Sequence, residues 1–193
     1  MTKPDPLLPR IDSAEMPDDV RGMFDASIAL RDDATFFEVM ANSPDLLRWY
    51  INDFYGGVFR SGRVPQAALE VLRLRLSVQH GCKFCNQGNR ISAQEAGLTD
   101  IEIDALFSDD FSMLRPELQA VAELSDTLMP TNAHGELSAD LYAKLSAHYS
   151  PAQIVELGMI GGMLSGVAKF LFAFDLVERE ASCPFPQRDK NSV

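Results

Sequence analysis

Apolar residues recur at helical spacing along most of this 193-residue chain. Within residues 18–30, for example, Val20, Met23, Phe24 and Ile28 fall close to the positions that form one face of a helix. No stretch shows the sustained alternation of apolar and polar residues that marks a half-buried strand. The pattern therefore predicts an all-α protein with seven or eight helices.

Local start and stop signals divide this pattern into segments. Ser or Thr caps and first-turn prolines open several of them, and glycine or proline ends others. The predicted helices cover residues 18–30, 43–59, 65–80, 82–97, 99–107, 115–129, 138–148 and about 151–180. We expect an extended, proline-containing arm at residues 1–12, one all-α domain at 13–180 and a tail at 181–193.

The last predicted helix carries Gly158, Gly162 and Gly166 four residues apart on one face. Such a stripe lets another backbone approach closely, so we expect tight helix packing there rather than a ligand site. The uncharged run at residues 157–168 is short compared with the roughly 20 residues that a membrane-spanning helix needs. The sequence therefore predicts no membrane span.

The overall charge excludes some partners. Seventeen basic against 28 acidic residues give a net charge of −11, which disfavours binding to nucleic acid and to anionic membranes. The three cysteines do not suggest a secreted disulfide framework, and the N-terminus lacks the apolar run of a signal peptide. We expect a cytoplasmic protein that binds neither nucleic acid nor membrane.

The clearest chemical signal is the CxxC pair Cys82 and Cys85, which follows Gly81 where one helix ends and the next begins. Unpaired N–H groups at a helix N-terminus favour a thiolate, which is the nucleophilic form of cysteine. Residues 61–100 also hold five basic against three acidic residues, although the chain as a whole is acidic. Two thiols at this spacing can attack a substrate and then close a disulfide.

Polar residues form a stripe along each of the two helices at this junction. The first stripe consists of Gln66, Glu70, Arg73, Ser77 and His80, and the second of Cys82, Cys85, Asn89 and Ser92. A solvated helix edge is one interpretation of the first stripe, with Glu70 and Arg73 as a surface ion pair. Because both stripes are consecutive and one holds the dithiol, we favour a shared pocket.

Glu70, the CxxC that begins twelve residues later and the segment GLTDIEIDAL at 97–106 resemble the AhpD-like branch of the carboxymuconolactone decarboxylase family. The upstream FFEVMANSPDLLRWYINDFYGGVF is similar to that family's lead-in, so the resemblance covers about residues 36–106. It implies an all-helical fold, assembly into homo-oligomers such as trimers or hexamers, and the chemistry of a dithiol peroxidase that reduces hydroperoxides or of a disulfide oxidoreductase. We expect no cofactor.

The resemblance also implies roles for individual residues. Cys85 would attack the hydroperoxide, Cys82 would resolve the product, Glu70 would act as the base, and an external dithiol would reduce the resulting disulfide. The family's relay histidine is replaced by Asn89, whose amide cannot accept and release a proton near neutral pH. We consider His80 a substitute for part of this function; the alternative is a helix-end residue that satisfies C-terminal carbonyls.

Other interpretations remain open at this point. A zinc site is poorly supported, because Cys183, His80, His134 and His148 form no second pair at ligand spacing, and Cys183 is expected to be a bystander. Asn89 favours a non-enzymatic or degenerate oligomeric family member. A lactone decarboxylase-like enzyme is a third possibility, against which the redox dithiol argues.

Overall fold

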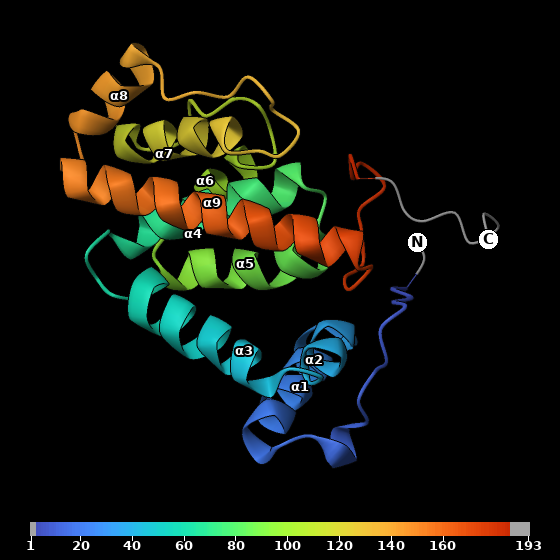
Figure 1. The fold of residues 1–193 in the computed structure, drawn as a ribbon. Coiled ribbons are helices and arrows are strands. Elements are labelled where there is room, and N and C mark those ends of the chain that lie inside the picture. Colours follow the sequence, from blue (N-terminus) through green and yellow to red (C-terminus); the bar gives the residue numbers. More distant parts are fainter. Residues whose placement is uncertain (1–2, 186–193) are drawn as a thin grey trace.

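The computed structural model describes residues 3–185, which contain no β-strand and only one isolated bridge. Its α-helices are α1 (Asp18–Arg31), α2 (Thr35–Met40), α3 (Pro44–Arg48), α4 (Gln66–Gln79), α5 (Lys83–Glu95), α6 (Asp100–Ala105), α7 (Pro116–Thr127), α8 (Ala139–Ser146) and α9 (Pro151–Ala173). A 3-10 turn, η1 (Ser13–Glu15), precedes α1, and the π-helical segment η2 (Trp49–Phe59) continues α3 directly (Figure 1). The all-α prediction is confirmed.

All of the predicted helices are present, and the structure adds one. The extra helix α2 is too short to display a helical period in the sequence, and most of its residues are buried. The last helix ends at Ala173 rather than near Glu180. Its end follows from Asp175, which takes a left-handed backbone conformation with φ of 56° and stops the helix from continuing.

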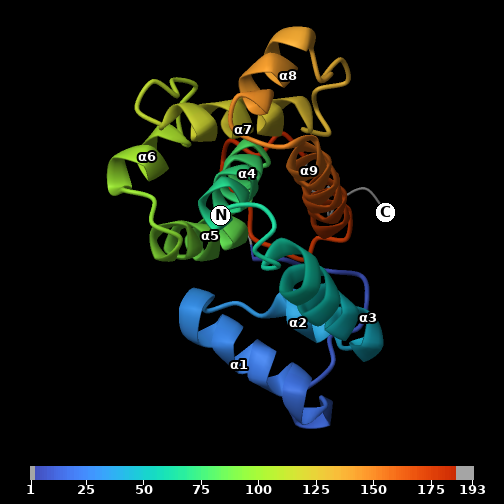
Figure 2. The same cartoon turned by 90° about the vertical axis from the view of Figure 1, so that its left-hand side faces the viewer.

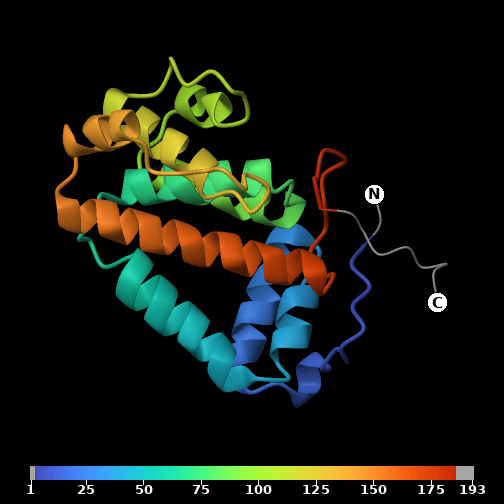
Figure 3. The ribbon, with the colours of Figure 1, turned by 45° about the horizontal axis from the view of Figure 1, so that its top comes forward.

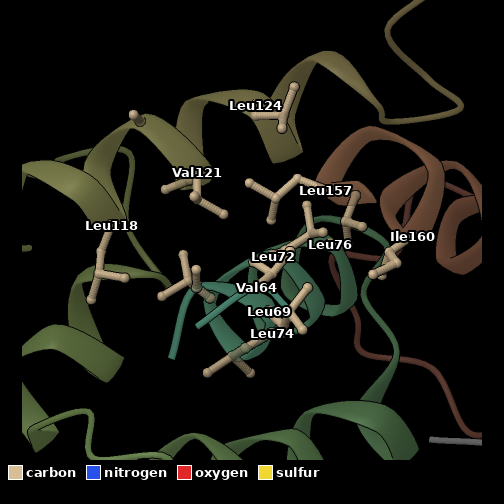
Figure 4. Close-up of a cluster of buried hydrophobic side chains, with 14 of the residues drawn as sticks. Val64, Leu69, Leu72, Leu74, Leu76, Leu118, Val121, Leu124, Leu157 and Ile160 are labelled. Carbon is tan, nitrogen blue, oxygen red and sulfur yellow. The ribbon is translucent and has the colours of Figure 1, made fainter. Parts of the chain in front are cut away.

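Helix α4 lies at the centre of the main bundle and packs against α5, α7 and α9. Figure 4 shows apolar side chains of α4, α7 and α9 meeting there, together with Val64 just before α4. The labelled side chains are Val64, Leu69, Leu72, Leu74, Leu76, Leu118, Val121, Leu124, Leu157 and Ile160, and all of them are buried. Each such burial contributes roughly 1.5–3 kcal/mol to folding, so this cluster fixes α4 as a rigid support.

One buried cation strengthens the contact between α4 and α7. Arg75 is only 2% exposed, and its Nε and Nη2 donate to the carboxylate of Asp126 at 2.8 and 3.1 Å. Its Nη1 donates to the main-chain oxygens of Leu106 and Ser108, after α6. Because a buried charge is tolerated only with such partners, Arg75 joins three parts of the bundle.

Helices α1 and α2 and the continuous helix α3–η2 form a separate group beside the main bundle (Figures 1 and 2). Their apolar side chains share a second hydrophobic cluster with the end of α9 and residues 176–177. Residues 3–12 have no regular structure, and Asp5 N–H reaches the Asp175 carboxylate at 3.0 Å. The boundaries 1–12, 13–180 and 181–193 stay predictions, and residues 186–193 of the tail lie outside the described residues.

After α9 the chain turns back towards the start of α5 (Figure 3). Glu180 N–H donates to Gly81 O at 2.8 Å, and Lys83 N–H donates to Glu178 O at 3.1 Å. Cys82 and Arg179 form an isolated antiparallel bridge between these hydrogen bonds. The segment at residues 178–183 therefore lies directly against the CxxC loop.

The glycine stripe of α9 behaves differently from the prediction. A Cβ at Gly158, Gly162 or Gly166 would meet no atom within 4 Å, so the expected tight packing is wrong within this chain. The close approach is made instead by Gly161, whose Cβ would collide with the Leu128 side chain. Among residues 3–185, α9 is the one helix long and apolar enough to cross a membrane, with 39% of its most apolar stretch buried. A core helix passes the same test, so this is weak evidence for a span.

Candidate active site

The CxxC pair lies at the N-terminus of α5 and forms a disulfide between Cys82 and Cys85, whose Cα atoms are 5.2 Å apart. Cys82 is the N-cap residue, and its Sγ accepts a hydrogen bond from the Cys85 N–H at 3.2 Å. Cys82 is 1% exposed, whereas Cys85 is half-buried. Of the two sulfurs, that of Cys85 is therefore the more accessible to a substrate.

Gly81 allows the C-terminal segment to cover the buried cysteine. Its φ is +63°, and a Cβ at this position would lie 2.5 Å from Cys183 Cα. The backbone of the third cysteine is thus packed beside the dithiol loop, although it is distant in sequence. The Cys183 thiol donates a weak hydrogen bond to Phe185 O at 3.6 Å, and its role as a bystander stays a prediction.

The polar stripe on α4 is buried, which excludes the solvated-edge interpretation. Glu70, Ser77 and His80 are 3%, 5% and 1% exposed, and the Arg73 side chain is 10% exposed. A buried polar stripe costs free energy unless its groups find partners. The stripe therefore belongs to an internal polar surface.

Glu70 is held by its own helix. Gln66 Nε2 donates to Oε1 at 2.9 Å, and Arg73 Nη2 donates to Oε2 at 2.5 Å. Arg73 lines the cavity at the dithiol, but Glu70 does not. The predicted base thus lies behind Arg73, and a proton from Cys85 would reach it through water or after Arg73 moves.

Asn89 stands where the family pattern has a histidine. It belongs to a hydrogen-bond network of groups that do not titrate. Its Nδ2 donates to Ser77 Oγ at 3.0 Å, which ties α5 to α4. Ser77 Oγ in turn lies 2.8 Å from Asn86 Oδ1 and 2.9 Å from Leu74 O. These groups position one another, but none of them accepts a proton near neutral pH.

His80 ends α4 and lines the same cavity. Burial lowers the pKa of His80 to about 4, and within the described residues its buried Nε2 has no hydrogen-bond partner. Its ring lies 5.8 Å from the Phe185 ring and 6.4 Å from the Phe172 ring. A base with this pKa is weak at neutral pH, which disfavours His80 as the substitute relay but leaves Nε2 able to contact a bound molecule.

A partly open cavity of about 290 Å³ lies between the two groups of helices, at the dithiol. Its wall consists of Arg31, Phe36, Phe37, Tyr50, Ile51, Tyr55, Arg60, Arg73, Leu76, Ser77, His80, Cys82, Phe84, Cys85, Asn89, Leu164, Val167, Ala168 and Leu171. Burial raises the pKa of Tyr50 well above its usual value, so this phenol stays neutral. The predicted shared pocket therefore exists, and four of the five predicted site residues line it.

The described residues offer no arrangement for a metal ion. No group of three or more His, Cys, Asp or Glu side chains within residues 3–185 is placed to hold one. His134 and His148 are exposed and lie on other parts of the surface. The cysteine pair is thus accounted for by the disulfide.

Part of the chain matches the sequence model of a known protein family. Residues 44–126, from the start of α3 into α7, match the sequence model of the carboxymuconolactone decarboxylase family. These residues belong to the carboxymuconolactone decarboxylase family. The matched segment contains Glu70, His80, both cysteines and Asn89, but not α1, α2 or α9.

Solved structures show that the fold is AhpD-like. The chain is similar to an uncharacterized peroxidase-related protein of Ralstonia eutropha JMP134, described as an alkylhydroperoxidase AhpD core, with 13% identity and a TM-score of 0.68 over 93% of this chain and 95% of that one. It is also similar to the debrominase Bmp8 C82A in complex with 2,3,4-tribromopyrrole, with 16% identity and a TM-score of 0.69 over 94% and 95% of the two chains.

Curated relatives cover less of the molecule. An uncharacterized protein of Mycobacterium tuberculosis, Rv2313c, is 28% identical over 117 residues, or 60% of this chain and 40% of that protein. The uncharacterized protein YdfG of Bacillus subtilis is 28% identical over 104 residues, or 52% of this chain and 69% of that protein. The chain thus spans about two fifths of the length of the M. tuberculosis relative.

Sequence reasoning missed the cavity wall that the first helices contribute. Arg31, at the end of α1, and the aromatic residues Tyr50 and Tyr55, in η2, line the cavity with the dithiol. One signal was available, since Gly88 lies in the middle of α5, where a glycine often marks a close approach. A Cβ there would collide with the Arg31 guanidinium.

Proposed function

We propose that this chain is a thiol-dependent peroxidase that reduces hydroperoxides through Cys82 and Cys85. The observation that carries the proposal is the Cys82–Cys85 disulfide at the helix N-terminus, in the wall of a partly open, largely apolar cavity. The AhpD-like fold and the peroxidase-related description of one similar protein are consistent with an antioxidant role. Cys85 is assigned the attack, because it is the more exposed thiol.

The reaction balances with one peroxide and one external dithiol. The Cys85 thiolate attacks one oxygen of the O–O bond, which breaks to give a sulfenic acid and an alkoxide that takes a proton to become the alcohol. The Cys82 thiol then displaces water from the sulfenic acid and forms the Cys82–Cys85 disulfide. An external dithiol reduces this bond and is itself oxidised.

Several charges favour the thiolate that begins the reaction. Cys85 lies in the first turn of α5, where unpaired N–H groups carry partial positive charge. Arg31 and Arg73 line the same cavity, and Glu70 holds Arg73 by an ion pair. In this proposal Glu70 receives the Cys85 proton through water, and Asn89 positions α5 against α4 through Ser77.

The proposal also includes the reductant, the oligomeric state and the location of the protein. The reductant is an external dithiol, the chain assembles into homo-oligomers such as trimers or hexamers, and it acts in the cytoplasm. Light scattering on the purified protein measures the oligomer directly.

A thiol count tests the proposal. The reduced protein should have three titratable thiols under denaturing conditions, because the chain has three cysteines. One equivalent of an organic hydroperoxide should remove two of them, and dithiothreitol should restore both. In Cys183→Ser the count should fall from two to none, which assigns the loss to the CxxC pair.

A degenerate, non-enzymatic family member is the second candidate. The observation that favours it is the cavity wall itself, where Asn89 cannot titrate and His80 has its pKa lowered to about 4. An unchanged thiol count after addition of the hydroperoxide, or oxidation no faster than that of glutathione, would support this candidate. Either result would overturn the peroxidase proposal.

A further inference from the structure

The cavity contains a guanidinium that forms no ion pair within the described residues, although the Asp33 carboxylate acts on it from farther away. Arg31 reaches from the end of α1 to α5, where its Nε donates to Phe84 O at 3.1 Å and its Cζ lies 4.4 Å from the centre of the Phe84 ring. Within the described residues, neither terminal nitrogen of Arg31 donates to a protein acceptor, and no carboxylate lies within ion-pair distance. Burial, and secondarily the nearby Arg73, lower the pKa of Arg31, which nevertheless stays protonated.

A second guanidinium lies close to the first. Arg73 is nine-tenths buried, and its Nε has no hydrogen-bond partner in the described part of the chain. Its Cζ lies 5.0 Å from the ring centre of Phe59, while Glu70 neutralises its charge from outside the cavity. The unsatisfied N–H groups of two neighbouring arginines create a site that an anionic oxygen would satisfy.

The charges of the wall all have one sign. Arg31, Arg60 and Arg73 line the cavity, and none of the described residues in its wall is an aspartate or glutamate. A cavity with low-dielectric walls and one sign of charge concentrates ligands of the opposite sign. An anion is therefore favoured there, although the whole chain carries a net charge of −11.

The rest of the wall selects an apolar ligand body. Aromatic side chains from α2, η2 and α5 cover one side, and aliphatic side chains of α4 and α9 cover another. About 290 Å³ accommodates a substituted benzene ring or a medium-length alkyl chain, and most of such a ligand would be removed from water.

From these contacts we infer that the cavity binds organic carboxylates with an aromatic or aliphatic body, the carboxylate held by Arg31 beside Arg73 and the body held by the aromatic wall. Combined with the proposed function, on which this step rests, the preferred substrate class is the hydroperoxide of an apolar carboxylic acid. The peroxide group would then face the CxxC pair, which lies in the same wall. Arg31 lies in α1, outside the segment at 44–126 that matches the family.

Binding of a stable analogue tests the inference without any reaction. The oxidised protein is titrated by calorimetry with 4-isopropylbenzoate and with the neutral isostere 4-isopropylbenzamide. We expect the acid to bind at least about tenfold more tightly, since an arginine–carboxylate contact is charge-assisted. Equal affinities for the acid and the amide would overturn the inference.

Two variants locate the anion. Arg31→Gln should weaken binding of the acid at least about tenfold and leave that of the amide unchanged. Arg90→Gln removes the same charge from the exposed surface, outside the cavity wall, and should change neither affinity. If Arg90→Gln weakens binding of the acid as much as Arg31→Gln does, the preference for the acid over the amide reflects the overall charge of the protein. Arg31 is then not the anion site. Circular dichroism and thermal unfolding verify that both variants fold.

Peroxide kinetics separate this inference from the proposed function. With 4-(2-hydroperoxypropan-2-yl)benzoate and its methyl ester as substrates, we expect kcat/KM to favour the acid at least about tenfold in the wild type and not in Arg31→Gln. Acid-selective binding without peroxide turnover would overturn the peroxidase and support the anion site. Turnover that is equal for acid and ester would support the peroxidase and overturn the anion site.

Discussion

Gly88 of α5 provides the space that the Arg31 guanidinium of α1 occupies. A Cβ at position 88 would collide with Arg31 Nη2 and lie 3.1 Å from Cζ, whereas no other atoms are that close. This contact joins the first helix group to the helix that carries the dithiol. A flexible arginine can move away from a new methyl group, so the site is open to a mild substitution.

Gly88→Ala should therefore displace Arg31 without unfolding the protein. The gain in helix propensity, up to about 1 kcal/mol, offsets the lost hydrogen bond to Phe84 O, so the free energy of unfolding should change by less than about 1 kcal/mol. Binding of 4-isopropylbenzoate should weaken severalfold. Gly22→Ala on α1, where a Cβ meets nothing within 4 Å, is the control. Unchanged acid binding in Gly88→Ala would show that Arg31 does not hold the anion.

Substitution of Cys85 and substitution of Cys82 should block different steps of the reaction. Cys85→Ser should reduce peroxide consumption to the uncatalysed rate, because it removes the nucleophile. Cys82→Ser should leave a sulfenic acid on Cys85 that a dimedone adduct reveals by mass spectrometry. Cys183→Ser should retain turnover. A dimedone adduct on Cys82 in the Cys85→Ser variant would reverse the assigned roles.

Burial of His80 should make the protein less stable in mild acid. Its pKa is lowered from 6.5 to about 4, so the unfolded chain binds the proton more tightly than the folded chain. The stability that depends on neutral His80 is complete above pH 6.5 and is lost as the pH falls from there towards 4. Between pH 7.5 and 5 this loss is about 2 kcal/mol.

Urea unfolding at both pH values measures this effect as a difference between variants. His80→Gln should lose about 2 kcal/mol less than the wild type over this range, since it has no imidazole to protonate. His134→Gln, which changes an exposed histidine, should lose as much unfolding free energy over this pH range as the wild type does. Parallel pH profiles for the wild type and His80→Gln would contradict the lowered pKa.

Arg75→Met should be strongly destabilising. It leaves two main-chain oxygens without their donor and removes the partner of the Asp126 carboxylate, which is 39% exposed and can be rehydrated, so the cost is about 2–3 kcal/mol. Arg63→Met removes an ion pair with Glu156 from a side chain that is 52% exposed and should cost less than about 1 kcal/mol. Urea denaturation compares the two, and equal losses would show that the Arg75 network contributes little.

Gly81→Ala should loosen the packing of residues 178–183 against the dithiol loop, whereas Gly97→Ala should strain only the turn after α5. Both glycines have positive φ, +63° and +87°, so alanine strains the backbone at each, at a cost of about 1 kcal/mol or more. Only at Gly81 would the new Cβ also meet backbone, that of Cys183 at 2.5 Å. Gly81→Ala should therefore expose the C-terminal segment to limited proteolysis, and resistance equal to that of Gly97→Ala would refute the contact.

Local patterns were sufficient to predict most helices and the chemical centre. Thr99 and Glu102 form the capping box that their spacing predicts at the start of α6, because its partners lie within one helical turn. Cys82 and Cys85 are likewise brought together by a single turn of α5. Such features depend on near neighbours, which the sequence displays directly.

The α9 stripe shows where local reasoning fails. Three glycines at a spacing of four predict a close approach, but whether a partner is present depends on how distant helices pack. The structure places Gly161 against Leu128 and leaves Gly158, Gly162 and Gly166 in open space. The same limit applies to Glu70, which the sequence places on one stripe with Arg73 but which Arg73 separates from the cavity.

By itself, the sequence determined an all-α chain, the bounds of most helices and a dithiol at a helix N-terminus, since these follow from interactions within one or two turns. Only the tertiary structure decided that the α4 stripe is buried, that burial lowers the pKa of His80, and that Arg31 reaches the dithiol cavity from α1. Burial and desolvation depend on which surfaces cover a residue. Those surfaces come from helices far away in the sequence, and their packing is settled only when the whole chain folds.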